Sequence, residues 1–437
     1  MISRRLQYEM AGRVVGPMLM ALEGWKTGLG RRKGSAGEGP FGPPLECTRE
    51  LKDLMGTYYY QGRYADGAVP VAWVASGFPV EVLRAHGFYT VYPENHGALC
   101  AARRMTPKLV QAAEDAGYSR DLCTYARSDI GSVITGRTPL GRVPKPDVVC
   151  ACGNICQTIV YWFRALADYF EVPFVLIDAP FVYGDFKSHH LDYVKDQLGE
   201  LGDVAESVSG RPVTEARIRT VFERACEASI LWDECLATAR RRPTPWTAFD
   251  QFIHMAPIVA IRGTEECTRY YRTLRDELED RVRRGIGAVR DERRRLLWDN
   301  IAIWYKLRDL SRTFAENGFA LVCATYTDAW AEMWRNFDAS DRIASTARMV
   351  SGVLLNRDLP NRMRTMERLI RRYEVDGVVL HSNRSCKPYS VGQYDLKDRM
   401  AQELGVKVVV IEADHAEPEA YSAEQVSTRL GAFMESF

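Results

Sequence analysis

The sequence predicts an α/β protein of two Rossmann-like, parallel-sheet domains, with a helical N-terminal extension and a central helical block. Short runs rich in β-branched residues alternate with helical segments in two separate parts of the chain, which is typical of parallel strands joined by right-handed crossovers. Between these parts strand signals vanish and helical spacing dominates. We therefore expect an N-terminal helical extension and linker over residues 1–60, a first α/β domain over 61–187, a helical block over 188–317 and a second α/β domain over 318–437.

Local patterns predict the individual elements. The chain begins with an amphipathic helical stretch, and residues 28–44 (GLGRRKGSAGEGPFGPP) contain so much Gly, Pro and basic residue that a mobile linker is expected. Helical periodicity resumes at 46–61. Strands are expected at 71–76, 89–92, 147–152 and 174–177 and again at 319–326, 377–381 and 406–412, and helices at 80–87, 157–170, about 354–373 and from 393.

Composition excludes several functional classes. With 58 Lys and Arg against 57 Asp and Glu, the net charge of +1 provides no field for nucleic acid or an anionic membrane, so we expect neither partner. The charge-dense segment 276–300 alternates in sign, which indicates a solvated helix face. We expect a cytoplasmic protein, because residues 1–7 are charged, the apolar stretch 14–22 is short, and the eleven cysteines do not have the spacing of a disulfide framework.

Nucleotide and hydrolase motifs are missing from the sequence. It contains no G-x-x-x-x-G-K-[ST] phosphate loop, no G-x-G-x-x-G dinucleotide fingerprint, no G-x-S-x-G elbow and no H-E-x-x-H helix. We therefore expect that this chain does not itself bind ATP.

Three cysteines differ from the others because each stands at a junction between elements. Cys123, Cys156 and Cys386 are flanked by Asn, Ser, Arg or Gly, and the last two directly follow predicted strands, where α/β proteins build their sites. Three thiolates from separate segments suit an iron–sulfur cluster with one iron left for another ligand. A zinc site formed by the C-A-C-G-N-I-C run at 150–156 is the weaker alternative, because the run lacks a second C-x-x-C knuckle.

Four stretches of the chain, 71–105, 117–131, 146–163 and 376–415, together resemble the 2-hydroxyacyl-CoA dehydratase and benzoyl-CoA reductase family of iron–sulfur subunits. They occur in family order and cover most of the chain outside the extension and the helical block. The motifs YPENHGA and LCTYARSDIG and the N-terminal extension are most similar to the B subunit of ATP-dependent (class I) benzoyl-CoA reductases.

The resemblance implies roles for particular residues. Family members bind a [4Fe-4S] cluster through three cysteines, at positions that match Cys123, Cys156 and Cys386 here. A serine that ends the first strand and a glutamate in the P-E-N turn lie near the cluster's fourth coordination site, and these match Ser76 and Glu94. Turn formation by the serine and helix capping by the glutamate are equally good explanations of the two residues.

His96, in the same turn, is a candidate proton donor, because a ring-reducing enzyme needs one beside its electron donor. A histidine with a purely structural role is the more common case.

The function implied by the resemblance is the iron–sulfur subunit of benzoyl-CoA reductase, which reduces the aromatic ring of benzoyl-CoA to a cyclic dienoyl-CoA by single low-potential electrons. The implied partners are a sister iron–sulfur subunit, ATP-hydrolysing activator subunits and reduced ferredoxin. Three alternatives stay open: an (R)-2-hydroxyacyl-CoA dehydratase subunit that works through a ketyl radical, a noncatalytic electron-relay subunit, and a zinc-stabilised structural protein.

Overall fold

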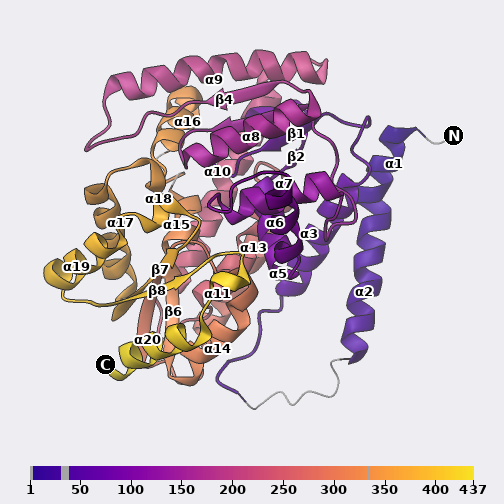
Figure 1. The fold of residues 1–437 in the computed structure, drawn as a ribbon. Coiled ribbons are helices and arrows are strands. Elements are labelled where there is room, and N and C mark those ends of the chain that lie inside the picture. Colours follow the sequence, from indigo (N-terminus) through magenta and orange to yellow (C-terminus); the bar gives the residue numbers. More distant parts are fainter. Residues whose placement is uncertain (1–2, 31–38, 333, 336) are drawn as a thin grey trace.

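The fold was analysed in a computed structural model that describes residues 3–30, 39–332, 334–335 and 337–437. These residues form two four-stranded sheets in which every pair of neighbouring strands is parallel, and helices surround both sheets (Figure 1). The predicted α/β class with two Rossmann-like domains is therefore confirmed.

The first sheet has the strand order β2-β1-β3-β4. Every residue of the two central strands, β1 and β3, is buried, which explains their continuous apolar sequence. The order reverses between β1 and β3, and ligands of open parallel sheets bind at such a switch point, beyond the carboxyl ends of the strands. The strands are β1 (Val71–Val74), β2 (Tyr89–Val91), β3 (Val148–Cys152) and β4 (Phe174–Ile177).

The second sheet repeats this arrangement with the order β6-β5-β7-β8, so its switch point lies between β5 and β7. The two domains thus share one strand topology without an evident repeat in their sequences. The strands are β5 (Arg294–Asp299), β6 (Phe319–Ala324), β7 (Gly377–Asn383) and β8 (Lys407–Ala413).

Strand β5 corrects the prediction that residues 188–317 are entirely helical and that segment 276–300 is a solvated helix face. Arg295 is fully buried in this strand, where it donates to the carbonyl oxygens of Ala239, Arg241 and Tyr373 and pairs with Glu292 at 2.6 Å. Because charged residues are typical of exposed positions, the sequence pattern did not indicate that Arg295 lies in a central strand of the second sheet. The domain boundaries stay a prediction, but β5 belongs to that sheet.

The N-terminal extension forms a column of helices beside the first domain, at the right of Figure 1. The predicted linker, 28–44, is only partly described: residues 28–30 belong to α2, and 31–38 lie outside the described residues. Residues 40–42 were expected to be mobile, but backbone hydrogen bonds hold them in place. The N–H of Arg290 donates to the carbonyl of Pro40, and the N–H of Gly42 donates to the carbonyl of Ala288. The helices are α1 (Arg4–Met10), the π-helical turn η1 (Ala11–Val15), α2 (Gly16–Gly30) and α3 (Thr48–Gly62).

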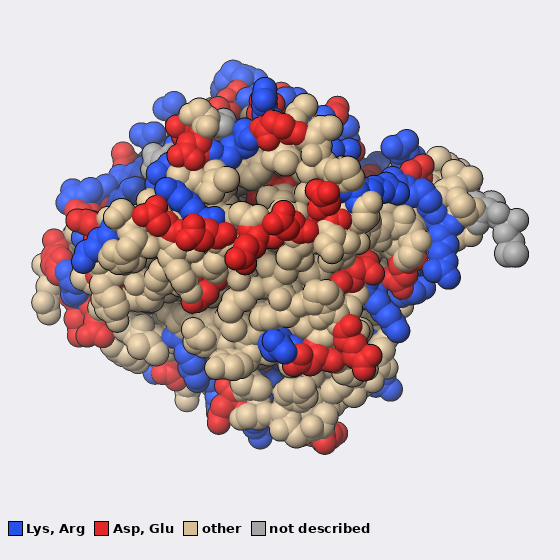
Figure 2. Space-filling model, turned by 90° about the horizontal axis from the view of Figure 1, so that it is seen from above, with Lys and Arg blue, Asp and Glu red and all other residues tan. Residues whose placement is uncertain are grey.

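The central block contains long helices that lie against both domains. Its first helix, α9, crosses the top of Figure 1 and has an acidic outer face, which Figure 2 shows as a red band. The exposed acidic residues of α9 are Asp192, Asp196, Glu200, Asp203 and Glu206. The helices of the block are α9 (Ser188–Ser209), α10 (Glu215–Thr238), α11 (Ala248–His254), α12 (Ala256–Ala260) and α13 (Glu265–Arg283).

The main hydrophobic core runs from the first sheet through α10 and α13 to the second sheet. A second core lies between the second sheet and α11, α14 and α20. No helix in the described part of the chain is long and apolar enough to cross a membrane. The helices of the first domain are α4 (Glu81–Ala85), α5 (Pro93–Ala102), α6 (Thr106–Asp115), α7 (Thr124–Thr135) and α8 (Gln157–Phe170). Those of the second are α14 (Leu307–Glu316), α15 (Thr325–Glu332), α16 (Arg342–Ser351), α17 (Leu359–Tyr373), α18 (Lys387–Ser390), α19 (Gln393–Leu404) and α20 (Ala423–Glu435), with the short 3₁₀ turns η3 (Trp304–Lys306), η4 (Ala339–Asp341), η5 (Leu354–Asn356) and η6 (Pro418–Ala420).

Candidate active site

The three junction cysteines occupy the same local position, directly before the first residue of a helix. Cys123 precedes α7, Cys156 precedes α8 at the switch point of the first sheet, and Cys386 precedes α18 after β7 of the second sheet. The fold brings the segments of Cys123 and Cys386 together, because the N–H of Thr124 donates to the Ser385 hydroxyl at 3.1 Å. The pKa of the Cys386 thiol is raised well above its ordinary value, first by burial and then by Cys123 and Cys156. The predicted trio therefore meets where the two domains face each other.

Each of the three cysteines is half-buried, and its sulfur faces backbone N–H groups from the first turn of its helix. Burial dominates and raises the pKa of Cys123 to about 12, so the free thiols are neutral, while the N–H groups favour the thiolate. These donors are the N–H groups of Tyr125 and Ala126 at Cys123, of Thr158 and Ile159 at Cys156, and of Tyr389 at Cys386. A bound metal would supply the positive charge that ionises such thiols.

The described residues do not form a ready-made site for a single metal ion. Within the described ranges, no three His, Cys, Asp or Glu side chains are placed to hold one ion. In a four-iron cluster each thiolate binds a different iron, so three cysteines from separate segments would each supply one ligand. The number and the chemical type of these donors are those that such a cluster requires.

An open cleft of about 890 Å³ begins at Cys156 and separates the two domains. The first domain contributes the loops after β3 and β4, and the second contributes η5 and the starts of α17 and α18. Its walls carry charges of both signs, from three basic and three acidic side chains: Arg357, Arg362, Lys387, Asp178, Asp358 and Asp395. The volume lies within the range of small-molecule sites, so the cleft can admit a large ligand to Cys156.

Ser76 and Glu94, which the sequence places 18 residues apart, are in direct contact. The N–H of Ser76 donates to Glu94 Oε1 at 2.8 Å, and Glu94 Oε2 is buried with no hydrogen-bond partner among the described residues. Burial outweighs the Ser76 hydrogen bond and raises the pKa of Glu94 to about 7. Because Glu94 in turn raises the pKa of Cys156, this carboxyl lies on the side of the cysteines.

The contacts of His96 are those of a structural residue. Its Nδ1 is 3.2 Å from Asp129, its Nε2 is 2.9 Å from the Thr138 hydroxyl, and the Cys100 sulfur is 3.6 Å from the same nitrogen. Burial lowers the pKa of His96, but Asp129 and Cys100 outweigh this and raise it to about 10. Both ring nitrogens are thus engaged within the first domain, and the predicted catalytic role of His96 stays untested.

Two residues near the cysteines were not predicted. Tyr326, in the first turn of α15, has a pKa raised by burial and then by Glu94 and Cys386, so its hydroxyl lies close to both. Asn154, two residues before Cys156, donates to the carbonyl of Val350 at 2.8 Å and ties the two domains together. Tyr326 is the last residue of the predicted strand 319–326, and its place at a strand end is a signal that could have identified it.

Comparison with known proteins identifies the family. Residues 75–437 match the family described as 2-hydroxyglutaryl-CoA dehydratase, D-component. The chain belongs to this family. The match begins directly after β1 and includes the other strands of both sheets, and the resemblance inferred from the motifs is confirmed.

Several relatives match this chain over most of their length. The (R)-phenyllactyl-CoA dehydratase alpha subunit of Clostridium sporogenes is 31% identical over 362 residues, which cover 82% of this chain and 88% of the relative. The (R)-2-hydroxyisocaproyl-CoA dehydratase alpha subunit of Clostridioides difficile is 30% identical, covering 88% and 94%. The B subunit of benzoyl-CoA reductase from Thauera aromatica is 28% identical, covering 89% and 93%.

Proposed function

We propose that this chain is the iron–sulfur subunit of an enzyme that acts on a CoA thioester, with a [4Fe-4S] cluster held by Cys123, Cys156 and Cys386. The observation that carries the proposal is that three half-buried cysteines from separate segments each stand at the N-cap of a helix, and that one of them, Cys156, lines a cleft of about 890 Å³. When bound, such a cluster supplies single electrons at low potential. The three cysteines would leave one iron of such a cluster without a cysteine ligand.

The residues around this position have defined tasks in the proposal. With a pKa of about 7, Glu94 is divided between its neutral and charged forms at neutral pH, so it can donate or accept a proton through the free Oε2. Ser76 orients the carboxyl through its backbone N–H. The buried hydroxyl of Tyr326, whose pKa is raised, stays neutral and can donate a hydrogen bond. The cleft walls position the thioester and limit the access of water.

The substrate that we propose is benzoyl-CoA, whose ring takes up two electrons and two protons to give a cyclic dienoyl-CoA. The motifs at 92–98 and 122–131, which resemble those of the B subunit of benzoyl-CoA reductases, support this choice, as does the Thauera aromatica relative. The proposed partners are a sister iron–sulfur subunit, ATP-hydrolysing activator subunits and reduced ferredoxin. Relatives named as alpha or B subunits support a multi-subunit complex.

A second candidate function is dehydration of an (R)-2-hydroxyacyl-CoA through a ketyl radical. The dehydratase alpha subunits of Clostridium sporogenes and Clostridioides difficile, at 31% and 30% identity, favour it. The contact between Ser76 and Glu94 is compatible with either reaction, because both need a proton-transferring group beside the cluster.

An anaerobic assay of the reconstituted complex with ATP and a strong reductant separates the two reactions. We expect benzoyl-CoA to be reduced and an (R)-2-hydroxyacyl-CoA to stay unchanged; dehydration without ring reduction would overturn the choice of substrate. Glu94→Gln tests whether this subunit is catalytic, with the exposed Glu424→Gln as the matched control. Loss of turnover with intact cluster absorption is expected, and unchanged turnover would indicate a noncatalytic electron relay.

A further inference from the structure

A buried carboxylate that the proposed chemistry does not use lies beside the cysteines. Asp414, directly after β8, is 1% exposed and accepts four hydrogen bonds. Its Oδ1 accepts from the N–H groups of Ala416 and Glu417 at 2.8 and 2.9 Å. Its Oδ2 accepts from the N–H of Ser385 at 3.2 Å and also from the Ser385 hydroxyl. Asp414 thereby fixes the backbone next to Cys386.

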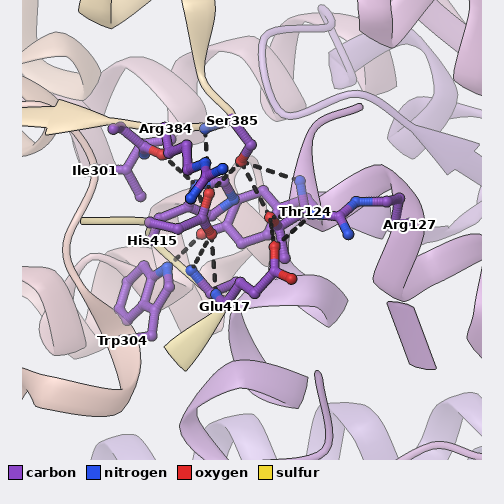
Figure 3. A network of polar contacts seen from close by, with 12 residues as sticks. Thr124, Arg127, Ile301, Trp304, Arg384, Ser385, His415 and Glu417 are labelled. Atoms are coloured by element: carbon purple, nitrogen blue, oxygen red, sulfur yellow. Dashed lines mark hydrogen bonds and ion pairs between the residues drawn. The ribbon is translucent and has the colours of Figure 1, made fainter. Parts of the chain in front are cut away.

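Ser385 extends this connection to the first domain, as Figure 3 shows. Its hydroxyl oxygen accepts the N–H of Thr124 at 3.1 Å, and the two hydroxyl groups are also 3.1 Å apart. Thr124 follows Cys123 in the sequence, and Ser385 precedes Cys386, although 261 residues separate the pair. One short chain of hydrogen bonds therefore joins the backbone at two of the three cysteines.

An ion-pair network supports the same connection. Arg127, which is 1% exposed, bridges Glu417 and Glu114, each at 2.5 Å. Glu417 also accepts the Thr124 hydroxyl at 3.4 Å and donates its own N–H to Asp414. Asp414, Ser385, Thr124 and Glu417 thus form a closed ring of hydrogen bonds that joins the two domains. The two cysteine segments cannot separate without breaking several of these partly buried contacts.

The negative charge of Asp414 affects the pKa of two of the cysteines. Burial raises the pKa of this carboxyl, but His415, Ser385 and the N–H groups of Ala416 and Glu417 lower it by more, so it is ionised. Its negative charge is among the causes that raise the pKa of Cys123 and of Cys386. Its hydrogen bond with the Ser385 N–H places the carboxylate one residue from Cys386. A negative charge at this place disfavours the addition of an electron to any group bound by these sulfurs.

We propose that Asp414 is a positioning residue that holds the Cys123 and Cys386 segments at a fixed separation and lowers the reduction potential of the cluster they bind. This inference rests on the proposed function, because it requires the cluster. The carboxylate acts in two ways: through Ser385 it fixes the two ligand segments, and through its charge it opposes reduction. A low potential suits a cluster that has to pass electrons to a poor acceptor.

The charge is tested with Asp414→Asn, which keeps the size of the side chain and one of its two acceptor oxygens. The matched control is Glu412→Gln, which removes a charge at an exposed position of β8, two residues before Asp414. Reduction of the full-length, reconstituted proteins is followed by electron paramagnetic resonance at controlled potentials. We expect Asp414→Asn to raise the potential by at least about 59 mV, which is tenfold in a one-electron equilibrium. A potential equal to that of the control would overturn the proposal.

The positioning is tested separately with Ser385→Ala, which keeps the charge of Asp414 but removes the bridge to Thr124. We expect iron to be lost to a chelator at least tenfold faster than from the wild type, with an unchanged potential; an unchanged rate of loss would overturn the positioning. If Asp414→Asn does not fold, Ser385→Ala decides the positioning alone. Wild-type protein that binds no iron would instead refute the proposed function, so the two failures are distinguishable.

Discussion

Replacing Glu94 by Gln removes one buried carboxyl group and should change how the stability of the protein depends on pH. The carboxyl has an ordinary pKa of 4.5 and a pKa of about 7 in the folded protein. Between these values the folded state keeps a proton that the unfolded state has released. The free energy of unfolding therefore falls as the pH rises toward 7 and stays lower above it.

The size of the effect follows from the two pKa values. A shift of about 2.5 pH units makes the wild type lose roughly 2.5 kcal/mol of stability between pH 5 and pH 8 from this group alone. Glutamine keeps the contact with the Ser76 N–H through its carbonyl oxygen but does not ionise. The difference in stability between Glu94→Gln and the wild type should thus shift by about 2.5 kcal/mol in favour of the variant over this range.

Urea unfolding of both proteins, freed of iron and followed by circular dichroism, measures this difference at several pH values. Taking the difference removes the contributions of all other titrating groups, because both proteins share them. Stability curves that run parallel from pH 5 to pH 8 would refute the buried, proton-holding environment assigned to Glu94.

Three further substitutions test the packing near the site and the assignment of β5. A Cβ at Gly77 would lie 2.9 Å from Ile155 and 3.0 Å from the Asn154 side chain, so Gly77→Ala should cost about 1–3 kcal/mol in thermal unfolding. Gly199→Ala on α9 meets open space and should stabilise by up to about 1 kcal/mol; equal effects would contradict the packing. Arg295→Met leaves Glu292 buried and unpaired and should cost about 3–5 kcal/mol. A cost below about 1 kcal/mol would contradict the assignment of β5.

The sequence was sufficient to predict the elements whose patterns are local. The strands at 174–177 and the helix at 157–170 lie where they were expected, because their apolar runs end at clear turn signals. Strand β5 was missed because Arg294 and Arg295 are typical of a solvated surface, and the burial of Arg295 depends on carbonyl groups supplied by distant segments.

Part of the candidate site could also be predicted from local patterns in the sequence. Cys156 and Cys386 could be singled out because they follow strands, and Cys123 because polar residues surround it at a junction. Asp414 could not be connected with them, because its link to Cys123 runs through Ser385 and exists only once the two domains meet. Tertiary contacts of this kind have no local pattern in the sequence.

Iron and acid-labile sulfide analysis of anaerobically reconstituted protein tests the central claim most directly. The wild type should bind about four iron atoms per chain, and Cys123→Ala, Cys156→Ala and Cys386→Ala should each lose the cluster absorption. Cys226→Ala, which removes a partly buried thiol on α10, should keep it. Wild-type protein without iron, or full iron content after loss of any of the three cysteines, would contradict the account.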